Sequence, residues 1–159
     1  MSPSAGGWTR AVALAAAVLV ADQATKQLAA AQLGPGERIG IGLGFDLAEV
    51  HNRGIAFGLF GGGEGMVIVV TLAVLALVLA YFTLDPARPG LWIGIGLLGG
   101  GALGNLADRL REDSVIDFID PPAWPAFNLA DVAIVVGVAT IVLVQMGSAE
   151  SEAKPRPGG

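Results

Sequence analysis

The chain has 159 residues, 53% of them hydrophobic and only 14% charged, and its formal net charge is −5. Soluble domains carry about 25% charged residues, so this composition indicates a single domain that lies mostly in lipid. The acidic balance argues against nucleic acid as a partner. With no cysteine and one histidine, disulfides, thiol catalysis and two-histidine metal sites are excluded, and we expect no metal or other cofactor.

The hydrophobic pattern predicts an all-α membrane protein with four transmembrane helices and a small β-rich segment. A span needs about 20 apolar residues, and the predicted spans are about 9–33, 66–84, 91–108 and 127–146. Residues 1–147 then form one polytopic domain, and residues 148–159 are predicted to be a disordered tail. Arg10 before an apolar run also suits a secretory signal peptide, but helical character continues to residue 33, which favours a retained span.

Within the first span, Asp22 and Lys26 are four residues apart and share a helix face. Two interpretations fit this spacing equally well. One is an ion pair near the membrane surface, with Lys26 extending outward to water. The other is a carboxylate that supports a site inside the helix bundle.

The segment 37–64 is too polar and too rich in glycine to cross a membrane. Apolar residues alternate with glycine or aspartate along it, at Ile39, Ile41, Leu43, Phe45 and Leu47. This period of two predicts a strand with one apolar face, lying at the membrane surface. Just after it, the simplest interpretations are an ordinary interfacial histidine at His51 and a turn-capping residue at Asn52.

Polar residues gather where the third span ends. Glycines four residues apart, from 96 to 104, predict close helix packing there. Asn105, Asp108 and Arg109 follow on one side of the same helix. Asp108 and Arg109 can also be explained as a salt bridge at the helix terminus.

Residues 110–125 are predicted to form a return loop that carries Asp117 between two apolar neighbours. An acid in an apolar setting is the kind whose pKa rises. Asn128 and Asp131 then lie three residues apart at the start of the fourth span. Helix capping explains Asn128 well, but Asp131 is followed at once by an apolar run and is harder to explain by capping alone.

Four spans bring these polar groups to one side of the membrane, where ionisable residues are functional candidates by default. The groups are Asp22, Lys26, Asn52, Asn105, Asp108, Arg109, Asp117, Asn128 and Asp131. Two carboxylates held close share one proton, so one accepts a proton from water while the other donates to a carbonyl oxygen. Asp131 is one candidate, and spacing alone leaves open whether Asp108 or Asp117 is its partner.

Five motifs occur in an order that resembles the lipoprotein signal peptidases, the signal peptidase II family. They are DQATK at 22–26, HNRGIAFG at 51–58, GGALGNLADR at 100–109, VIDFI at 115–119 and FNLAD at 127–131. The resemblance implies an intramembrane aspartic endopeptidase of the bacterial cytoplasmic (inner) membrane. Such an enzyme removes the signal peptide from diacylglyceryl-modified prolipoproteins by cutting before the lipidated cysteine.

The resemblance also implies roles for individual residues. Asp117 and Asp131 would be the catalytic pair; the residues that orient the pair, hold substrate or support the site would be Asn52, Asn105, Asp108, Arg109, Asn128, Asp22 and Lys26. Both termini would lie in the cytoplasm, with the active site and the β-rich segment near the extracytoplasmic face. The expected partners are a prolipoprotein substrate and membrane lipid, and the expected state is a monomer.

Two other classes of protein remain as alternatives. A small membrane transporter or proton channel also holds acids in the membrane, but it predicts polar groups on both sides of the midplane, whereas the far half of each span is almost purely apolar. A non-catalytic scaffold predicts that asparagine can replace Asp117 or Asp131 without consequence.

Overall fold

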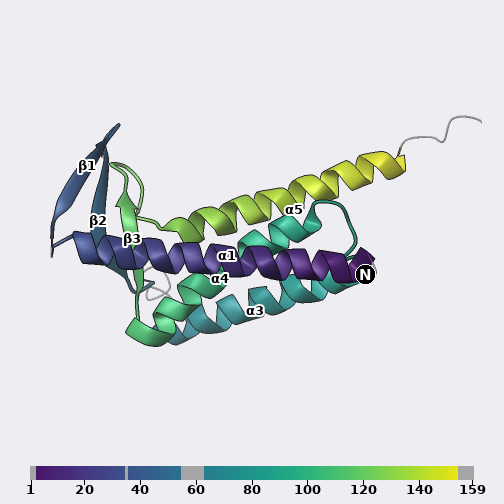
Figure 1. Ribbon diagram of the computed structural model, residues 1–159, viewed down its shortest axis with the longest axis horizontal. Helices are drawn as coiled ribbons and strands as arrows, with labels where there is room; N and C mark the ends of the chain where they lie inside the picture. Colours follow the sequence, from purple (N-terminus) through teal and green to yellow (C-terminus); the bar gives the residue numbers. More distant parts are fainter. Residues whose placement is uncertain (1–2, 35, 55–62, 154–159) are drawn as a thin grey trace, which may run out of the picture.

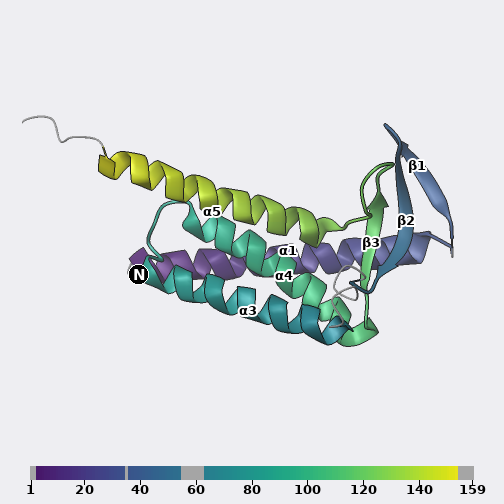
Figure 2. The ribbon, with the colours of Figure 1, turned by 180° about the vertical axis from the view of Figure 1, so that it is seen from behind.

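The computed structural model describes residues 3–34, 36–54 and 63–153. In this part of the chain, long helices run alongside one another and a small sheet covers one end of the bundle (Figure 1; seen from behind in Figure 2). The helices are α1 (Pro3–Gln32), α3 (Gly63–Leu84), α4 (Leu91–Glu112) and α5 (Leu129–Ala153). The strands are β1 (Arg38–Gly42), β2 (Phe45–Asn52) and β3 (Val115–Asp120).

Three of the described helices are long and apolar enough to cross a membrane, over the stretches Ser4–Gln32, Gly65–Leu84 and Leu129–Ser148. The sequence predicts four spans, and α4 is a helix but is not among these three. Its hydropathy is lowered by many glycines and by the polar residues at its C-terminal end. Because α1, α3 and α5 all pack against α4, protein rather than lipid surrounds much of this helix.

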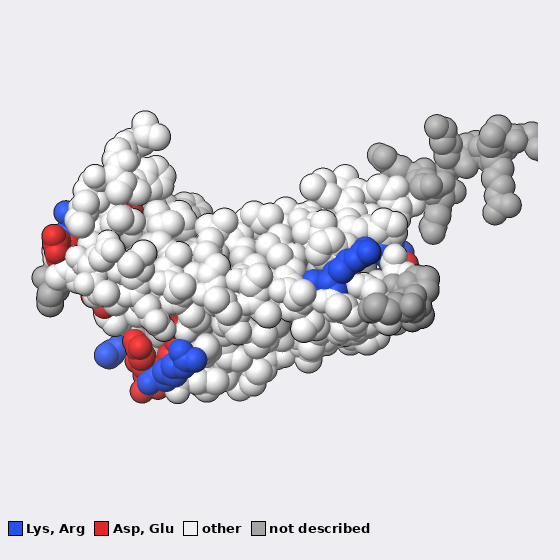
Figure 3. All heavy atoms as spheres, viewed as in Figure 1, with Lys and Arg blue, Asp and Glu red and all other residues white. Residues whose placement is uncertain are grey.

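The outer surface of the bundle is apolar. Leu77, Val135 and Leu143 are 71%, 67% and 67% exposed. Figure 3 shows Lys, Arg, Asp and Glu toward the two ends of the face in view, with a wide uncharged surface between them. A bundle solvated by lipid requires this pattern, because acyl chains form no hydrogen bonds with charged groups.

Glycines allow α4 to approach its neighbours on two faces. A Cβ atom at Gly100 would lie 2.6 Å from the carbonyl oxygen of Ala15 on α1, and one at Gly101 would lie 2.5 Å from that of Ala130 on α5. Any larger residue at these positions would separate the helices. The close packing predicted from the glycine spacing is therefore confirmed.

The sheet has the order β1-β2-β3, with both pairings antiparallel. The alternating segment is not one strand, as the sequence predicts, but a hairpin in which Gly42 pairs with Phe45. Leu43 and Gly44 have φ angles of 54° and 80°, the left-handed pair that a two-residue hairpin turn of type I′ needs. Alternation continues across this turn and hides it. The remainder of the β-rich segment at 55–62 lies outside the described residues.

Two predicted segments have different structures from those expected. Residues 115–120 of the predicted return loop form β3, because they pair with β2. Helix α5 continues to Ala153, so the first part of the predicted disordered tail is helical. The sequence SAESEA contains no helix breaker ahead of Pro155, which explains the extension. Residues 154–159 lie outside the described residues.

One cluster of buried apolar residues lies at the end of the bundle away from the sheet. It contains Ala11, Phe82, Leu91 and Ile95, and Trp8 packs edge-on against Phe82 with ring centroids 4.7 Å apart. The buried polar residues Asp22, Lys26, Asn105, Asp108, Asp117 and Asn128 belong to the opposite parts of α1 and α4, to β3 and to the start of α5. Figure 1 shows that the helices meet the sheet at that end.

Candidate active site

A closed loop places β3 beside the start of α5. Phe127 donates its N–H to the carbonyl oxygen of Ile119 at 2.9 Å, and Ile119 donates to the carbonyl oxygen of Phe127 at 3.0 Å. Asn128 follows directly. The loop therefore brings Asp117, on β3, next to the first turn of α5 although the two segments are separated in sequence.

Asn128 and Asp131 cap α5 reciprocally. Asn128 Oδ1 accepts the backbone N–H of Asp131 at 3.0 Å, and Asp131 Oδ2 accepts the backbone N–H of Asn128 at 3.2 Å. This arrangement is a capping box, in which an N-cap side chain and an acidic side chain three residues later bind each other's backbone. The capping interpretation of both residues is confirmed, and it leaves the Asn128 amide nitrogen and Asp131 Oδ1 for contacts with other elements.

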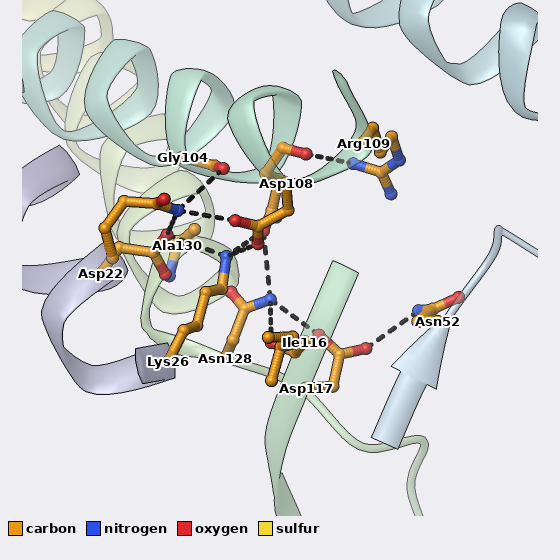
Figure 4. A network of polar contacts seen from close by, with 12 residues as sticks. Asp22, Lys26, Asn52, Gly104, Asp108, Arg109, Ile116, Asp117, Asn128 and Ala130 are labelled. Carbon is orange, nitrogen blue, oxygen red and sulfur yellow. Dashed lines mark hydrogen bonds and ion pairs between the residues drawn. The ribbon is translucent and has the colours of Figure 1, made fainter. Parts of the chain in front are cut away.

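Two amides bind Asp117. Asn128 Nδ2 donates to its Oδ1 at 2.7 Å, and Asn52 Nδ2, on the neighbouring strand β2, donates to its Oδ2 at 3.0 Å (Figure 4). Burial, followed by the charge of Asp131, raises the pKa of Asp117 to about 6, although these two hydrogen bonds and Lys26 lower it. Asp117 and Asp131 therefore interact electrostatically and share Asn128 as a binding partner.

A buried lysine lies behind this pair. Lys26 Nζ is 2.8 Å from Asp22 Oδ2 and 2.6 Å from Asp108 Oδ2. Asp22 and Lys26 do form an ion pair, but Lys26 is 2% exposed and Asp22 is fully buried. The expectation that Lys26 extends outward to water is therefore wrong, and the pair lies inside the bundle. Asp108 is paired with this ammonium. Asp117, by contrast, binds Asn128, the residue that also binds Asp131.

Asn105 connects the lysine cluster to the acid pair. Its Oδ1 accepts from Lys26 Nζ at 2.9 Å and from Asn128 Nδ2 at 3.1 Å. Its Nδ2 donates to Asp131 Oδ1 at 2.8 Å. One buried amide at the end of α4 therefore contacts residues of both α1 and α5.

Asp22 also holds the helices in place. Its Oδ1 accepts the backbone N–H of Ala130, in the first turn of α5, at 2.9 Å. A Cβ atom at Gly104 of α4 would lie 2.5 Å from Asp22 Oδ2. The fully buried carboxylate therefore depends on glycine at this position.

Sequence reasoning missed Gln23. Its Nε2 donates to Asp108 Oδ1 at 2.7 Å, and its Oε1 accepts from Arg111 Nη1 at 2.9 Å. Gln23 therefore binds one oxygen of Asp108, and Lys26 pairs with the other. Its position three residues before Lys26, on the same helix face, is the signal that could have identified it.

Arg109 and His51 form contacts with residues other than Asp117 and Asp131. Arg109 Nη1 donates to the backbone carbonyl of Asn105 at 3.2 Å. His51 lies within hydrogen-bond distance of Ser114 Oγ, at 3.2 Å, and of Glu49 Oε1, at 3.0 Å, and half of its side chain is exposed. These contacts agree with the interpretation of His51 as an interfacial residue.

The fold and the site together define a class: a helical membrane protein with a coupled pair of carboxylates at the end of an apolar bundle. Most of the predicted site residues meet there, from three helices and two strands (Figure 4). Among the described residues, no group of three or more His, Asp or Glu side chains is arranged to hold a metal ion. Paired carboxyl groups of this kind can take and give protons.

Comparisons with known proteins identify the family to which the chain is similar. A family model described as signal peptidase (SPase) II matches residues 14–146. The chain is 43% identical over 141 residues to the lipoprotein signal peptidase of Pelotomaculum thermopropionicum, covering 87% of this chain and 93% of the relative. It is 47% identical over 127 residues to that of Moorella thermoacetica, covering 79% and 85%. A solved bacterial membrane enzyme, determined by the in meso method at 2.3 Å, aligns with a TM-score of 0.81 at 27% identity over 94% of each chain.

The chain therefore belongs to the signal peptidase II family, and the resemblance identified from its motifs is confirmed. Signal peptidases are proteases, and the similar fold of a solved membrane enzyme agrees with the apolar surface of the bundle.

Proposed function

We propose that this protein is an intramembrane aspartic endopeptidase that removes the signal peptide from diacylglyceryl-modified prolipoproteins, cutting before the lipidated cysteine. The observation that carries the proposal is the binding of Asp117 and Asp131 to the same residue, Asn128, from a strand and a helix. The family and its curated relatives, which are named lipoprotein signal peptidases, support the substrate class.

In the proposed reaction Asp131 is the base and Asp117 the acid. Ionised Asp131 takes a proton from a water molecule as its oxygen attacks the peptide carbonyl carbon, and neutral Asp117 gives its proton to the carbonyl oxygen. When the C–N bond breaks, the leaving nitrogen takes the proton held by Asp131, and one hydroxyl of the tetrahedral intermediate returns its proton to Asp117, so a carboxylic acid and an amine leave and both aspartates are restored. The raised pKa of Asp117 supports its role as the proton donor.

The other site residues would hold the pair and the substrate. Asn105 and Asn128 would orient the two carboxylates, and Asn52 and Arg109 would contact the substrate backbone and headgroup region. The protein would cross the bacterial inner membrane four times, with α4 as the third crossing and the sheet near the extracytoplasmic face. A scissile bond just outside the lipid surface would then reach the acids, because Asp117 lies on β3 and Asp131 lies in the first turn of α5.

Cleavage of a diacylglyceryl-modified prolipoprotein by purified protein in detergent tests the proposal. Asp117→Asn and Asp131→Asn should each abolish cleavage while the variants still purify as folded protein. The matched control is Asp85→Asn, which changes an acid paired with Arg88 in the turn before α4 and should cleave like wild type. Wild-type rates in either of the first two variants would remove that acid from the catalytic pair.

A chelator provides a second test, because the proposed acid–base chemistry uses only carboxylates and water. Adding a chelator of divalent cations should leave the cleavage rate unchanged. Inhibition that is reversed by a specific divalent ion would contradict the aspartic mechanism.

A further inference from the structure

Oxygen atoms of three side chains surround the Lys26 ammonium. It donates hydrogen bonds to Asp22 Oδ2 at 2.8 Å and Asn105 Oδ1 at 2.9 Å, and it forms an ion pair with Asp108 Oδ2 at 2.6 Å. An ammonium has three donors and no acceptor. Every group facing it must therefore present an oxygen, and Asn105 is the one neutral side chain among the three.

This contact decides which way the Asn105 amide faces. With Oδ1 toward Lys26, Nδ2 faces Asp131 Oδ1 and donates to it at 2.8 Å. If the amide were rotated by half a turn, its NH₂ group would face the ammonium and its oxygen would face a carboxylate. Both contacts would be repulsive, and in a buried setting the repulsion is costly.

Asn128 reinforces the same orientation. Its Nδ2 also donates to Asn105 Oδ1, at 3.1 Å, and to Asp117 Oδ1, at 2.7 Å. Lys26 therefore donates to Asn105, and the amides of Asn105 and Asn128 in turn donate to Asp131 and Asp117. Figure 4 shows the contact between Asn128 and Asp117.

We propose that Lys26 is a positioning residue for the reaction, whose ammonium fixes the Asn105 amide so that an N–H group is presented to Asp131. The inference rests on the proposed function, because it gives Asn105 a role only if Asp131 is a reacting acid. It differs from a purely structural role, in which Lys26 would join α1 to α4 through its ion pair with Asp108 whatever residue occupied position 105.

A double-mutant cycle between Lys26→Met and Asn105→Ala separates these roles. Asn105→Ala should lower kcat by about tenfold to a hundredfold, the range for losing one hydrogen bond to a charged group, with KM unchanged. Lys26→Met should lower kcat in the same way. If Lys26 acts through Asn105, the double variant should be no slower than the slower single variant. If the two residues act independently, the fold losses in kcat of the single variants should multiply in the double variant.

Removing Lys26 leaves two buried carboxylates without their counter-ion, which can prevent folding. The same cycle is therefore repeated in an Asp108→Asn background. In that background Lys26→Met leaves only one buried carboxylate, Asp22, without its counter-ion. The matched control is Gln27→Met, an exposed neighbour on α1 that should keep wild-type kcat. Folded protein is measured by size exclusion and circular dichroism before each assay.

The results of the cycle distinguish a positioning lysine from a structural one. Non-additive losses of kcat with KM unchanged support the proposal. Multiplicative losses, wild-type kcat in Asn105→Ala, or failure of Lys26→Met to fold in both backgrounds would overturn it in favour of a structural lysine. Failure of the proposed function has a different signature, because the wild-type protein would then not cleave the prolipoprotein, or would cleave it without dependence on Asp117 and Asp131.

Discussion

Asp22 Oδ1 on α1 accepts the backbone N–H of Ala130 on α5 at 2.9 Å, although 108 residues separate them in the chain. The same carboxylate binds Lys26 through its other oxygen. A negative charge at a helix N-terminus is favourable, because it binds N–H groups that have no partner within the helix. One side chain therefore holds the first helix of the chain against the last.

The first prediction concerns stability. Asp22→Ala removes a cap from α5 and one carboxylate from a buried lysine, and breaking a buried ion pair costs about 3 kcal/mol or more. We expect a clear fall in the melting temperature in detergent. The control is Asp85→Ala, because Asp85 forms a partly exposed pair with Arg88, and such surface pairs contribute about 0–1 kcal/mol. Equal melting temperatures for the two variants would contradict a supporting role for Asp22.

The second prediction concerns pH. With the pKa of Asp117 raised to about 6, the neutral acid exists below that pH and is lost as the pH rises through it. Cleavage that requires neutral Asp117 should therefore decline with an apparent pKa near 6, a value that belongs to the coupled pair. A profile of kcat against pH that stays flat across this range would contradict the assignment of Asp117 as the proton donor.

Asn52 offers a directional test of the same assignment. Its hydrogen bond to Asp117 lowers the pKa of that acid, so Asn52→Ala should move the alkaline decline in kcat to higher pH. Glu49→Gln, on the same strand, is the control, because Glu49 pairs with His51 instead. A shift to lower pH in Asn52→Ala, or equal shifts in both variants, would show that the Asn52 bond does not act on the reacting acid.

The third prediction separates Asp108 from the catalytic pair. Asp108 is bound by Lys26 and Gln23, so Asp108→Asn should lower stability but keep measurable cleavage, unlike Asp117→Asn. Asp113→Asn is a control near the same helix end: Asp113 is exposed and has a φ of 53°, a conformation that asparagine tolerates. Complete loss of cleavage in a folded Asp108→Asn protein would return Asp108 to consideration as a reacting acid.

The gathering of acids at one end of the bundle could be predicted from sequence, because it follows from the order of the hydrophobic segments alone. Which side chains bind one another within this cluster could not be predicted from sequence. Spacing leaves Asp108 and Asp117 equivalent, and the distinction comes from Lys26 reaching across from α1. The pairing of β3 with β2 is equally hidden, since VIDFI is short and its partner strand lies more than sixty residues earlier, as the contact between Asn52 and Asp117 illustrates.

The last prediction concerns helix packing around the site. A Cβ atom at Gly104 would lie 2.5 Å from Asp22 Oδ2, whereas one at Gly99 on the same helix meets open space. Gly104→Ala should therefore displace Asp22 from Lys26 and from α5, with a cost of about 1–3 kcal/mol for overpacking, and should lower both melting temperature and kcat. Gly99→Ala should be neutral or slightly stabilising, because alanine favours helix by about 1 kcal/mol over glycine. Thermal denaturation and cleavage assays on the two variants, made side by side, check this difference. Similar behaviour of the two would mean that Asp22 can move away without harm, and that its tight contact with α4 is unimportant for the site.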